Sequence, residues 1–260
     1  MLPVPYGAAP WRRPLDRFIE RIHIMSPRPG ETRRKVDLLP DGSTCLVMRL
    51  FKSGAADIAV RGPRTYAYYK SAPAIPLSLI VVFRPGGAYP FFGLPVSELT
   101  DDIVALEELW GASGRALLDR IVVTAQSGGD IAAVVENGLL GRLRAHPFEP
   151  PSAVAARGAV RLLAHGDRSV ADVARELGIS ERHLRRAFRA AVGFSPKTYA
   201  RIARFQRALA LGRARPGRWN DVAIATGYFD QAHLTADFRE LALVPPGALD
   251  DDLPRKWCPE

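Results

Sequence analysis

Residues 169–196 read SVADVARELGISERHLRRAFRAAVGFSP, and this stretch decides the fold of the second half of the chain. After Ser169, apolar residues follow the i, i+3, i+4, i+7 spacing of a helix, and Gly178 ends that helix. Ser180 can cap a second helix that begins at Glu181, because its hydroxyl can accept a hydrogen bond from a free first-turn amide. A helix, a glycine turn and a second helix are the helix-turn-helix pattern.

The same landmarks return in residues 219–246, WNDVAIATGYFDQAHLTADFRELALVPP. Residues 170–174 return as 219–223 and Gly178 as Gly227, both at an offset of 49. The two buried positions of the second helix return at an offset of 50, Leu184 and Phe188 as Leu234 and Phe238. We therefore predict a duplicated unit whose second turn is one residue longer.

Basic residues gather on the outer face of the first unit. Its second helix carries arginines at i, i+3, i+4 and i+7, namely Arg182, Arg185, Arg186 and Arg189. Like charges at this spacing cost about 0.2–0.5 kcal/mol per pair. We expect this row to lack acidic partners in its own helix and to be compensated by phosphates and base edges. Residues 157–218 contain 15 basic and 4 acidic residues, whereas 219–260 contain 3 and 8, so the positive field is local.

A long helix is predicted to join the two units from Ser195, which can cap it, and Pro196, which suits its first position. Its apolar seam is Ile202, Phe205 and Leu209, and its basic edge is Lys197, Arg201 and Arg204.

The tandem arrangement resembles the DNA-binding domain of AraC-type transcriptional regulators over about 100 residues, through the element GFSP at 193–196 and the element GYFDQAHL at 227–234. The resemblance implies that both recognition helices enter successive major grooves of double-stranded DNA. It places base reading on Arg182, Arg185, Arg186, Gln231, Ala232 and Thr235, and we expect phosphate contacts from Ser180, Arg189, Lys197, Arg201 and Arg204.

The second unit departs from the family pattern. Ala236 stands where an arginine or another polar reader is common, and Asp237 follows in an acidic segment that weakens attraction to phosphate. We expect an unequal pair, in which the first unit carries most of the affinity. The second would contribute through Gln231, Thr235 and backbone amides.

The first half predicts a compact β unit of barrel or sandwich type. Short β-branched or aromatic runs such as TCLVMRLF and LSLIVVF alternate with proline and glycine turns between about Phe18 and Tyr89. Two helices follow, RALLDRIVVTA and a second helix that Asp130 can cap; they pack either on the β unit or on a partner chain. The fold class is α+β, with residues 1–145 as a cupin-like sensor or dimerisation domain, 146–151 as a Pro-rich linker and 152–260 as an all-α double helix-turn-helix.

No catalytic constellation, cofactor or metal site is expected. His23 stands alone in the β unit, whose sequence resembles, less specifically, the N-terminal domain of one AraC-type branch; the ligand is not readable. Cys45 suits a small core residue, and Cys258 is too isolated to interpret. The aromatics of the β unit fit a small-molecule pocket or an ordinary core equally well: Tyr66, Tyr68, Tyr69, Phe83, Tyr89, Phe91 and Phe92.

Composition agrees with a regulator. The 260 residues carry a net charge of +9, which favours polyanionic partners. No apolar run reaches the 18 to 20 residues of a membrane span, and the N-terminus has no signal-peptide core, so we expect a cytoplasmic protein without membrane contact. We expect an activator or repressor that binds double-stranded DNA, with a small-molecule effector, a homodimer partner and, for an activator, RNA polymerase. A cupin-like enzyme with a DNA-binding appendage and a constitutive architectural protein are the alternatives.

Overall fold

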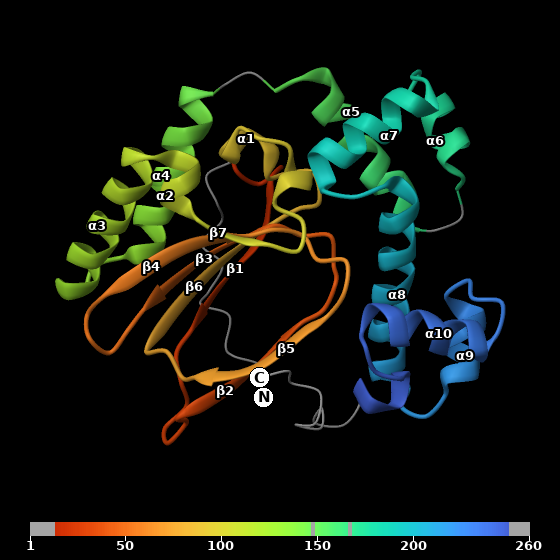
Figure 1. Cartoon of the computed structure of the whole chain (residues 1–260), viewed down its shortest axis with the longest axis horizontal. Helices are drawn as coiled ribbons and strands as arrows, with labels where there is room; N and C mark the ends of the chain where they lie inside the picture. The colour runs from red at the N-terminus through yellow and green to blue at the C-terminus, as the bar shows by residue number, and fades with distance from the viewer. Residues whose placement is uncertain (1–13, 147–148, 166–167, 250–260) are drawn as a thin grey trace.

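The computed structural model describes residues 14–146, 149–165 and 168–249, with sheets first and helices after them (Figure 1). The strands are β1 Ile19–Met25, β2 Arg33–Leu38, β3 Cys45–Leu50, β4 Ala56–Arg61, β5 Tyr68–Pro73, β6 Leu77–Phe83 and β7 Ile103–Ala105. The helices are α1 Tyr89–Phe92, α2 Leu106–Trp110, α3 Ala112–Gln126, α4 Ile131–Ala145, α5 Pro151–Leu163, α6 Val170–Glu176, α7 Glu181–Val192, α8 Pro196–Ala214, α9 Trp219–Ala225 and α10 Gln231–Leu241, with short 3₁₀ turns η1 Val96–Glu98 and η2 Pro246–Leu249. The expected α+β fold class is confirmed.

The strands form two antiparallel sheets. One has the order β1-β6-β3-β4-β7, and the other is the pair β2-β5. In the centre of the larger sheet, Leu46 lies opposite Val60 on one side and Val81 on the other. The two sheets stay separate among the described residues, so the barrel option was wrong.

Sequence patterns missed β2 and β7. Four of the six residues of β2 are charged, Arg33, Arg34, Lys35 and Asp37, and the strand pairs only with β5. A strand with little buried surface does not need the apolar alternation from which strands are recognised. β7 is three residues long and extends the sheet edge at β4.

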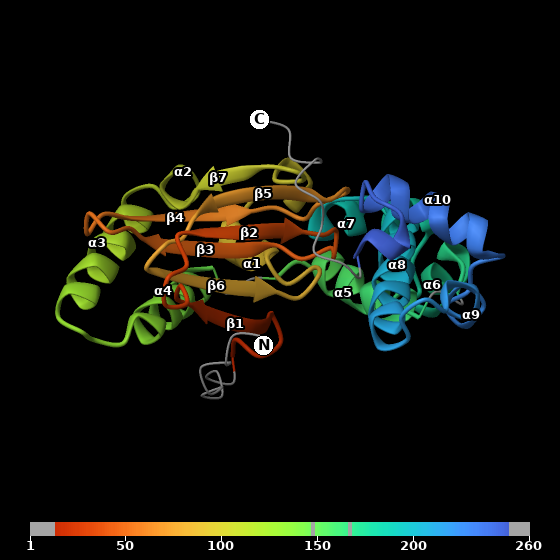
Figure 2. The same cartoon turned by 90° about the horizontal axis from the view of Figure 1, so that it is seen from below.

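The sheet region, residues 14–146, has its own hydrophobic core. Phe91 of α1 packs against Phe83 of β6 and Phe18, with ring centroids 5.1 and 5.4 Å apart. The two expected helices are α3 and α4, whose inward residues Leu117 and Val135 join this core and are at most 1% exposed. They pack on the larger sheet at the end away from α8 (Figure 2), so the β unit itself supplies their contact.

The helical region, residues 149–249, is built on the predicted duplication. The first unit is α6 and α7 and the second unit is α9 and α10; α6 and α9 start 49 residues apart, and α7 and α10 start 50 apart. The predicted caps are present, with the hydroxyls of Ser169, Ser180 and Ser195 accepting from amides three residues ahead. No helix among these and the other described residues is long and apolar enough to cross a bilayer.

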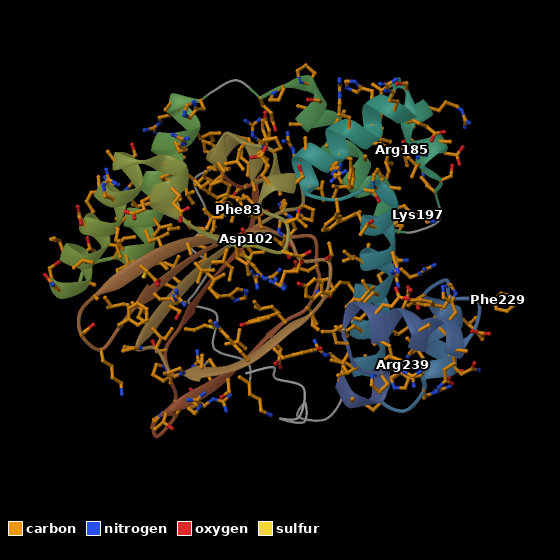
Figure 3. The ribbon with its side chains drawn as sticks, in the orientation of Figure 1. Phe83, Asp102, Arg185, Lys197, Phe229 and Arg239 are labelled. Carbon is orange, nitrogen blue, oxygen red and sulfur yellow. The ribbon has the colours of Figure 1, made fainter. Side chains whose placement is uncertain are left out.

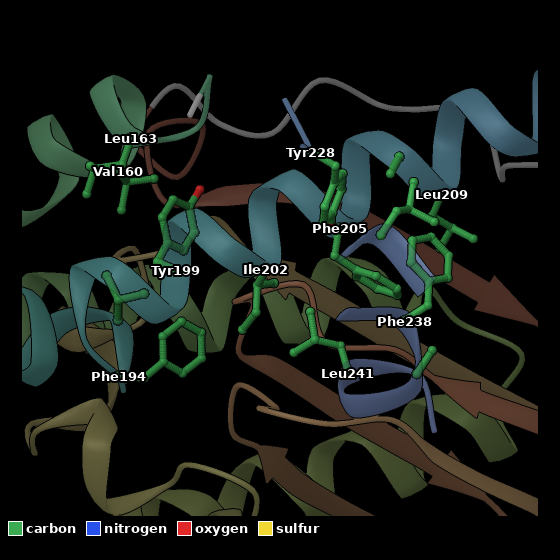
Figure 4. Close-up of a cluster of buried hydrophobic side chains, with 14 of the residues drawn as sticks. Val160, Leu163, Phe194, Tyr199, Ile202, Phe205, Leu209, Tyr228, Phe238 and Leu241 are labelled. Carbon is green, nitrogen blue, oxygen red and sulfur yellow. The ribbon is translucent and has the colours of Figure 1, made fainter. Parts of the chain in front are cut away.

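The two units share one core along α8 (Figure 4). Ile202, Phe205 and Leu209, the predicted seam, are at most 2% exposed. Phe205 contacts Phe238 of α10 edge to face at 4.7 Å between ring centroids. The relative position of the units is therefore set by large buried side chains on a single helix.

Candidate nucleic-acid interface

The arginine row lies on the free side of α7. The Ser180 hydroxyl accepts from the His183 amide at 3.2 Å and defines where the helix begins. Leu184 and Phe188 are fully buried on the opposite side. The outer face consists of exposed arginines, Arg182, Arg185, Arg186 and Arg189. The burial of the apolar stripe thus orients all four guanidinium groups outward.

One arginine of the row has an acidic partner in its own helix, contrary to expectation. The Arg185 Nη2 atom lies 2.6 Å from Glu181 Oε2, one turn earlier. Both side chains are over 40% exposed, so the pair contributes only about 0.3–0.5 kcal/mol and phosphate can compete for the arginine. In the described part of the chain, no ion pair engages Arg182, Arg186 or Arg189.

Two adjoining hollows lie at the N-terminal half of α8. One, of about 400 Å³, is bounded by the start of α6, by Arg185 and by the start of α8. The other, of about 370 Å³, is lined by Lys197, Thr198, Ala200, Arg201 and Arg204. Both include Lys197, which is exposed, and the larger hollow also includes Arg185; Figure 3 labels both residues on the helical region.

The other two basic residues of α8 are held by α10. The Arg201 Nε atom donates to Asp237 Oδ1 at 2.8 Å, and its Nη2 atom donates to Glu240. Burial acts to lower the pKa of Arg201, but its hydrogen bonds with Glu240 and Asp237 outweigh that effect and raise it. Arg204 lies 3.3 Å from the second Asp237 oxygen and 4.4 Å above the Tyr228 ring. Part of the predicted phosphate-binding charge is thus compensated inside the molecule.

Asp237, which we expected to weaken attraction to phosphate, is buried and paired with α8. Its residue is only 5% exposed, and its carboxylate joins α10 to α8 through Arg201 and Arg204. The equivalent residue of the first unit, 50 positions earlier, is Ala187. The charge at this position stabilises the packing of the second unit and lowers the free charge of α8.

The outer face of α10 has no row of cations. Its start is fixed by Asp230, which accepts from the His233 amide at 2.7 Å. The predicted readers Gln231 and Ala232 are exposed, and Thr235 is half-buried. Arg239, in the last turn, is the exposed cation of this helix within the described residues.

Comparisons with known proteins address the helical region directly. Residues 173–251 match a family model described as a helix-turn-helix domain, and that range spans most of the first unit, α8 and the second unit. The helical region carries an AraC-type helix-turn-helix domain. Such a domain supports a role in DNA-binding transcription regulation. Residues 9–105 match a family model described as a domain of unknown function.

Several solved structures are similar to the chain. A transcriptional regulator with an AraC-type DNA-binding domain from Chromobacterium violaceum is 24% identical, with 38% of this chain and 92% of that chain covered and a TM-score of 0.36. A probable AraC family regulator from Rhodopseudomonas palustris is 24% identical, with 40% and 98% covered and a TM-score of 0.33. ToxT from Vibrio cholerae is 10% identical, with 89% and 96% covered and a TM-score of 0.41. No curated protein matches the chain.

The sheet region contacts the AraC-type domain at the C-terminal end of each recognition helix, which sequence reasoning missed. After α7, Thr100 Oγ1 donates to the Gly193 carbonyl at 3.0 Å. At the end of α10, the Ala67 amide donates to the Leu241 carbonyl at 2.7 Å, and the Tyr69 hydroxyl donates to the Ala242 carbonyl at 2.6 Å. Each of these bonds joins residues more than 90 positions apart, so no local sequence signal predicts them.

The remaining candidates of the sheet region have structural surroundings. Phe83, Phe91 and Phe92 are buried, and the rings of Phe91 and Phe92 both pack against Phe83, as in an ordinary core, whereas Tyr66 is 44% exposed. Cys45 is fully buried, burial raises the pKa of its thiol, and Arg61 donates to its sulfur. Cys258 lies outside the described residues. Among the described residues, no three His, Cys, Asp or Glu side chains cluster as metal ligands would.

Proposed function

We propose that this chain is a sequence-specific transcription regulator that binds double-stranded DNA chiefly through α7. The observation that carries the proposal is the exposed row of Arg182, Arg185, Arg186 and Arg189, three of which have no ion pair in the described part of the chain. A guanidinium group matches the O6 and N7 acceptors of guanine in the major groove. The row is therefore suited to reading guanines, with Arg189 at the phosphates.

The geometry of α8 supports a backbone path between the two recognition helices. Lys197 is exposed and lines both hollows, and the first turn of α7, which Ser180 caps, supplies further backbone amides. Helix N-termini and lysines are common phosphate partners. Arg201 and Arg204 would contribute less than Lys197, because Asp237 already compensates them.

The second unit would add sequence reading with little electrostatic affinity. Gln231 is exposed in the first turn of α10, where recognition helices of this architecture meet base edges. Thr235 and the backbone amides of that turn complete its polar contacts. The AraC-type domain is then asymmetric, with a charged half and a nearly neutral half.

The sheet region would adjust, through its contacts with both recognition helices, the arrangement of the two halves that the core along α8 sets. Its contacts at Gly193, Leu241 and Ala242 hold the C-terminal ends of both recognition helices. A small-molecule effector or self-association that moves the sheet region would change how well the two helices fit successive grooves. RNA polymerase is a further partner if the protein activates.

Binding of the full chain to duplexes selected from a random pool tests the proposal. We expect a selected duplex to bind at least about 10³-fold more tightly than a scrambled one, with affinity that falls steeply as salt rises. Equal affinity for both duplexes would contradict sequence reading, and no binding at low ionic strength would contradict the proposal altogether. Tyr69→Phe, which deletes one contact with α10, tests the control by the sheet region; unchanged affinity for the selected duplex would argue against it.

A further inference from the structure

Phe229 is the most exposed large apolar side chain among the described residues, at 89% exposure. Its neighbour Tyr228 is 4% exposed and belongs to the core of the helical region. Of two consecutive aromatic residues, one is therefore buried and the other stands in solvent. The Phe229 ring is therefore fully accessible to a binding partner.

Phe229 is the residue that makes the second turn longer. In the first unit, the Ile179 amide donates to Ala174 at 3.0 Å, and Ser180 directly follows as the cap of α7. In the second unit, the Tyr228 amide makes the equivalent bond to Ala223 at 2.9 Å, but one residue, Phe229, is inserted before the cap of α10. Both neighbours of Phe229 keep their structural roles, so its outward position is built into the turn.

The inserted side chain lies at the reading end of α10. It directly precedes the cap residue Asp230 and the exposed Gln231. Figure 3 shows Phe229 projecting outward from the second unit, on the edge of the helical region turned away from the sheets. A helix-turn-helix unit meets base edges with the N-terminal residues of its second helix, and Phe229 lies directly before those residues in α10.

The neighbours of Phe229 define the chemistry of this surface. Ala232 and Ala236 are exposed apolar residues on the outer face of α10, and the first two turns of the helix hold no cation. In the major groove, the apolar group available for contact is the C5-methyl of thymine, whereas the amide of a glutamine such as Gln231 pairs with adenine. Phe229, Gln231, Ala232 and Ala236 therefore suit contacts with A·T pairs. They provide no positive charge for binding to phosphate.

We propose that Phe229 is a specificity-determining residue that packs on thymine C5-methyl groups, so that the second unit reads an A·T-rich half-site. The proposal rests on the proposed DNA-binding function and extends it to the base composition of the second half-site. Ala232 widens the apolar contact, and Gln231 fixes the register through adenine.

Replacement of thymine by deoxyuridine, which removes only the C5-methyl, tests this contact in the full chain. The selected duplex is prepared with deoxyuridine in one half-site at a time. We expect the second half-site to lose about 4-fold in affinity for each contacted methyl with the unaltered protein. Phe229→Ala should bind the thymine duplex more weakly and should no longer distinguish thymine from deoxyuridine there.

Two controls separate this contact from general effects. Ile224→Ala shortens another exposed apolar side chain, 68% exposed at the end of α9, and should leave the thymine preference unchanged. Placing 7-deazaguanine in the first half-site should weaken binding equally for the unaltered protein and for Phe229→Ala. Thermal unfolding of Phe229→Ala should match that of the unaltered chain, because the ring is almost fully exposed.

The results distinguish this inference from the proposed function. If a selected duplex is bound but deoxyuridine has no effect, or Phe229→Ala keeps the thymine preference, the inference is overturned while the proposed function stands, and the tip is free for a protein partner. If no duplex is bound, both are overturned.

Discussion

The two helix-turn-helix units lie along the same helix, α8, yet their outer faces carry opposite chemistry. At equivalent positions, 50 residues apart, α7 has Arg182, Arg185 and Arg186, and α10 has Ala232, Thr235 and Ala236. The inner faces agree, since Leu184 and Phe188 are as fully buried as Leu234 and Phe238. The buried half of each helix therefore maintains the duplicated fold, and the exposed half is free to acquire its own recognition chemistry.

The units also differ where they join the rest of the molecule. Asp237 in α10 replaces Ala187 in α7 and pairs with α8. After the recognition helices, the left-handed position is Gly193 in the first unit and Leu243 in the second, with φ of 103° and 60°. Each difference gives a prediction that makes one unit resemble the other.

The largest effect is expected from Asp237→Ala, which gives α10 the residue of α7. It leaves Arg201 and Arg204 without their buried carboxylate, so we expect the free energy of unfolding to fall by about 3 kcal/mol. Urea unfolding of the full chain measures it. Glu240→Gln is the matched control, because that partner of Arg201 is 66% exposed and should cost less than about 0.5 kcal/mol. Equal losses for the two variants would show that Asp237 does not anchor the second unit.

A smaller effect is expected at the left-handed positions. Gly193→Ala places a Cβ 2.6 Å from Pro63 and 2.7 Å from Thr100 at a positive φ, so it should cost about 2 kcal/mol and weaken the contact with the sheet region. Leu243→Gly removes strain at the equivalent position and should stabilise by up to about 1 kcal/mol. The denaturant midpoint should fall for Gly193→Ala and rise for Leu243→Gly. A lower midpoint for both variants would contradict the equivalence of the two positions.

Arg186→Ala should weaken binding to the selected duplex by about 1–3 kcal/mol, because it removes one guanine contact. Its binding to scrambled DNA should change little. The reciprocal Ala236→Arg should add a guanine preference to the second half-site. Repeating the duplex selection with each variant reads out both changes. Equal losses of Arg186→Ala on selected and scrambled duplexes would assign Arg186 to phosphate instead.

The smallest effect concerns α8. Lys197→Ala should reduce the slope of log affinity against log salt by about 1, because an exposed lysine releases a counterion on binding. Arg204→Ala should lower binding evenly across sequences and flatten the slope less, since Asp237 already compensates Arg204. Binding titrations at four salt concentrations measure the slope for both variants. A larger change of slope for Arg204→Ala than for Lys197→Ala would mean that the ion pair of Arg204 with Asp237 opens when DNA binds.

The helical region was predictable because its signals are local. Helix caps, glycine stops and apolar spacing lie within a few residues of one another, and the helix pattern found in one unit recurs in the other. The ion pairs of Arg201 and Arg204 with Asp237 and the bond from Tyr69 to Ala242 depend on tertiary packing, so composition could not reveal them. Strand β2 was missed because charged residues hide its alternation, whereas the partner Glu181 of Arg185 was readable at i−4 and was overlooked.

Interference by guanine N7 methylation, with the full chain and a selected duplex, tests the central claim most directly. If the arginines of α7 face the groove, methylated guanines should block binding in the half-site of the first unit, and Arg186→Ala should erase part of that pattern while the second half-site stays silent. Interference patterns that are the same for both proteins, or are confined to the half-site of the second unit, would contradict the account.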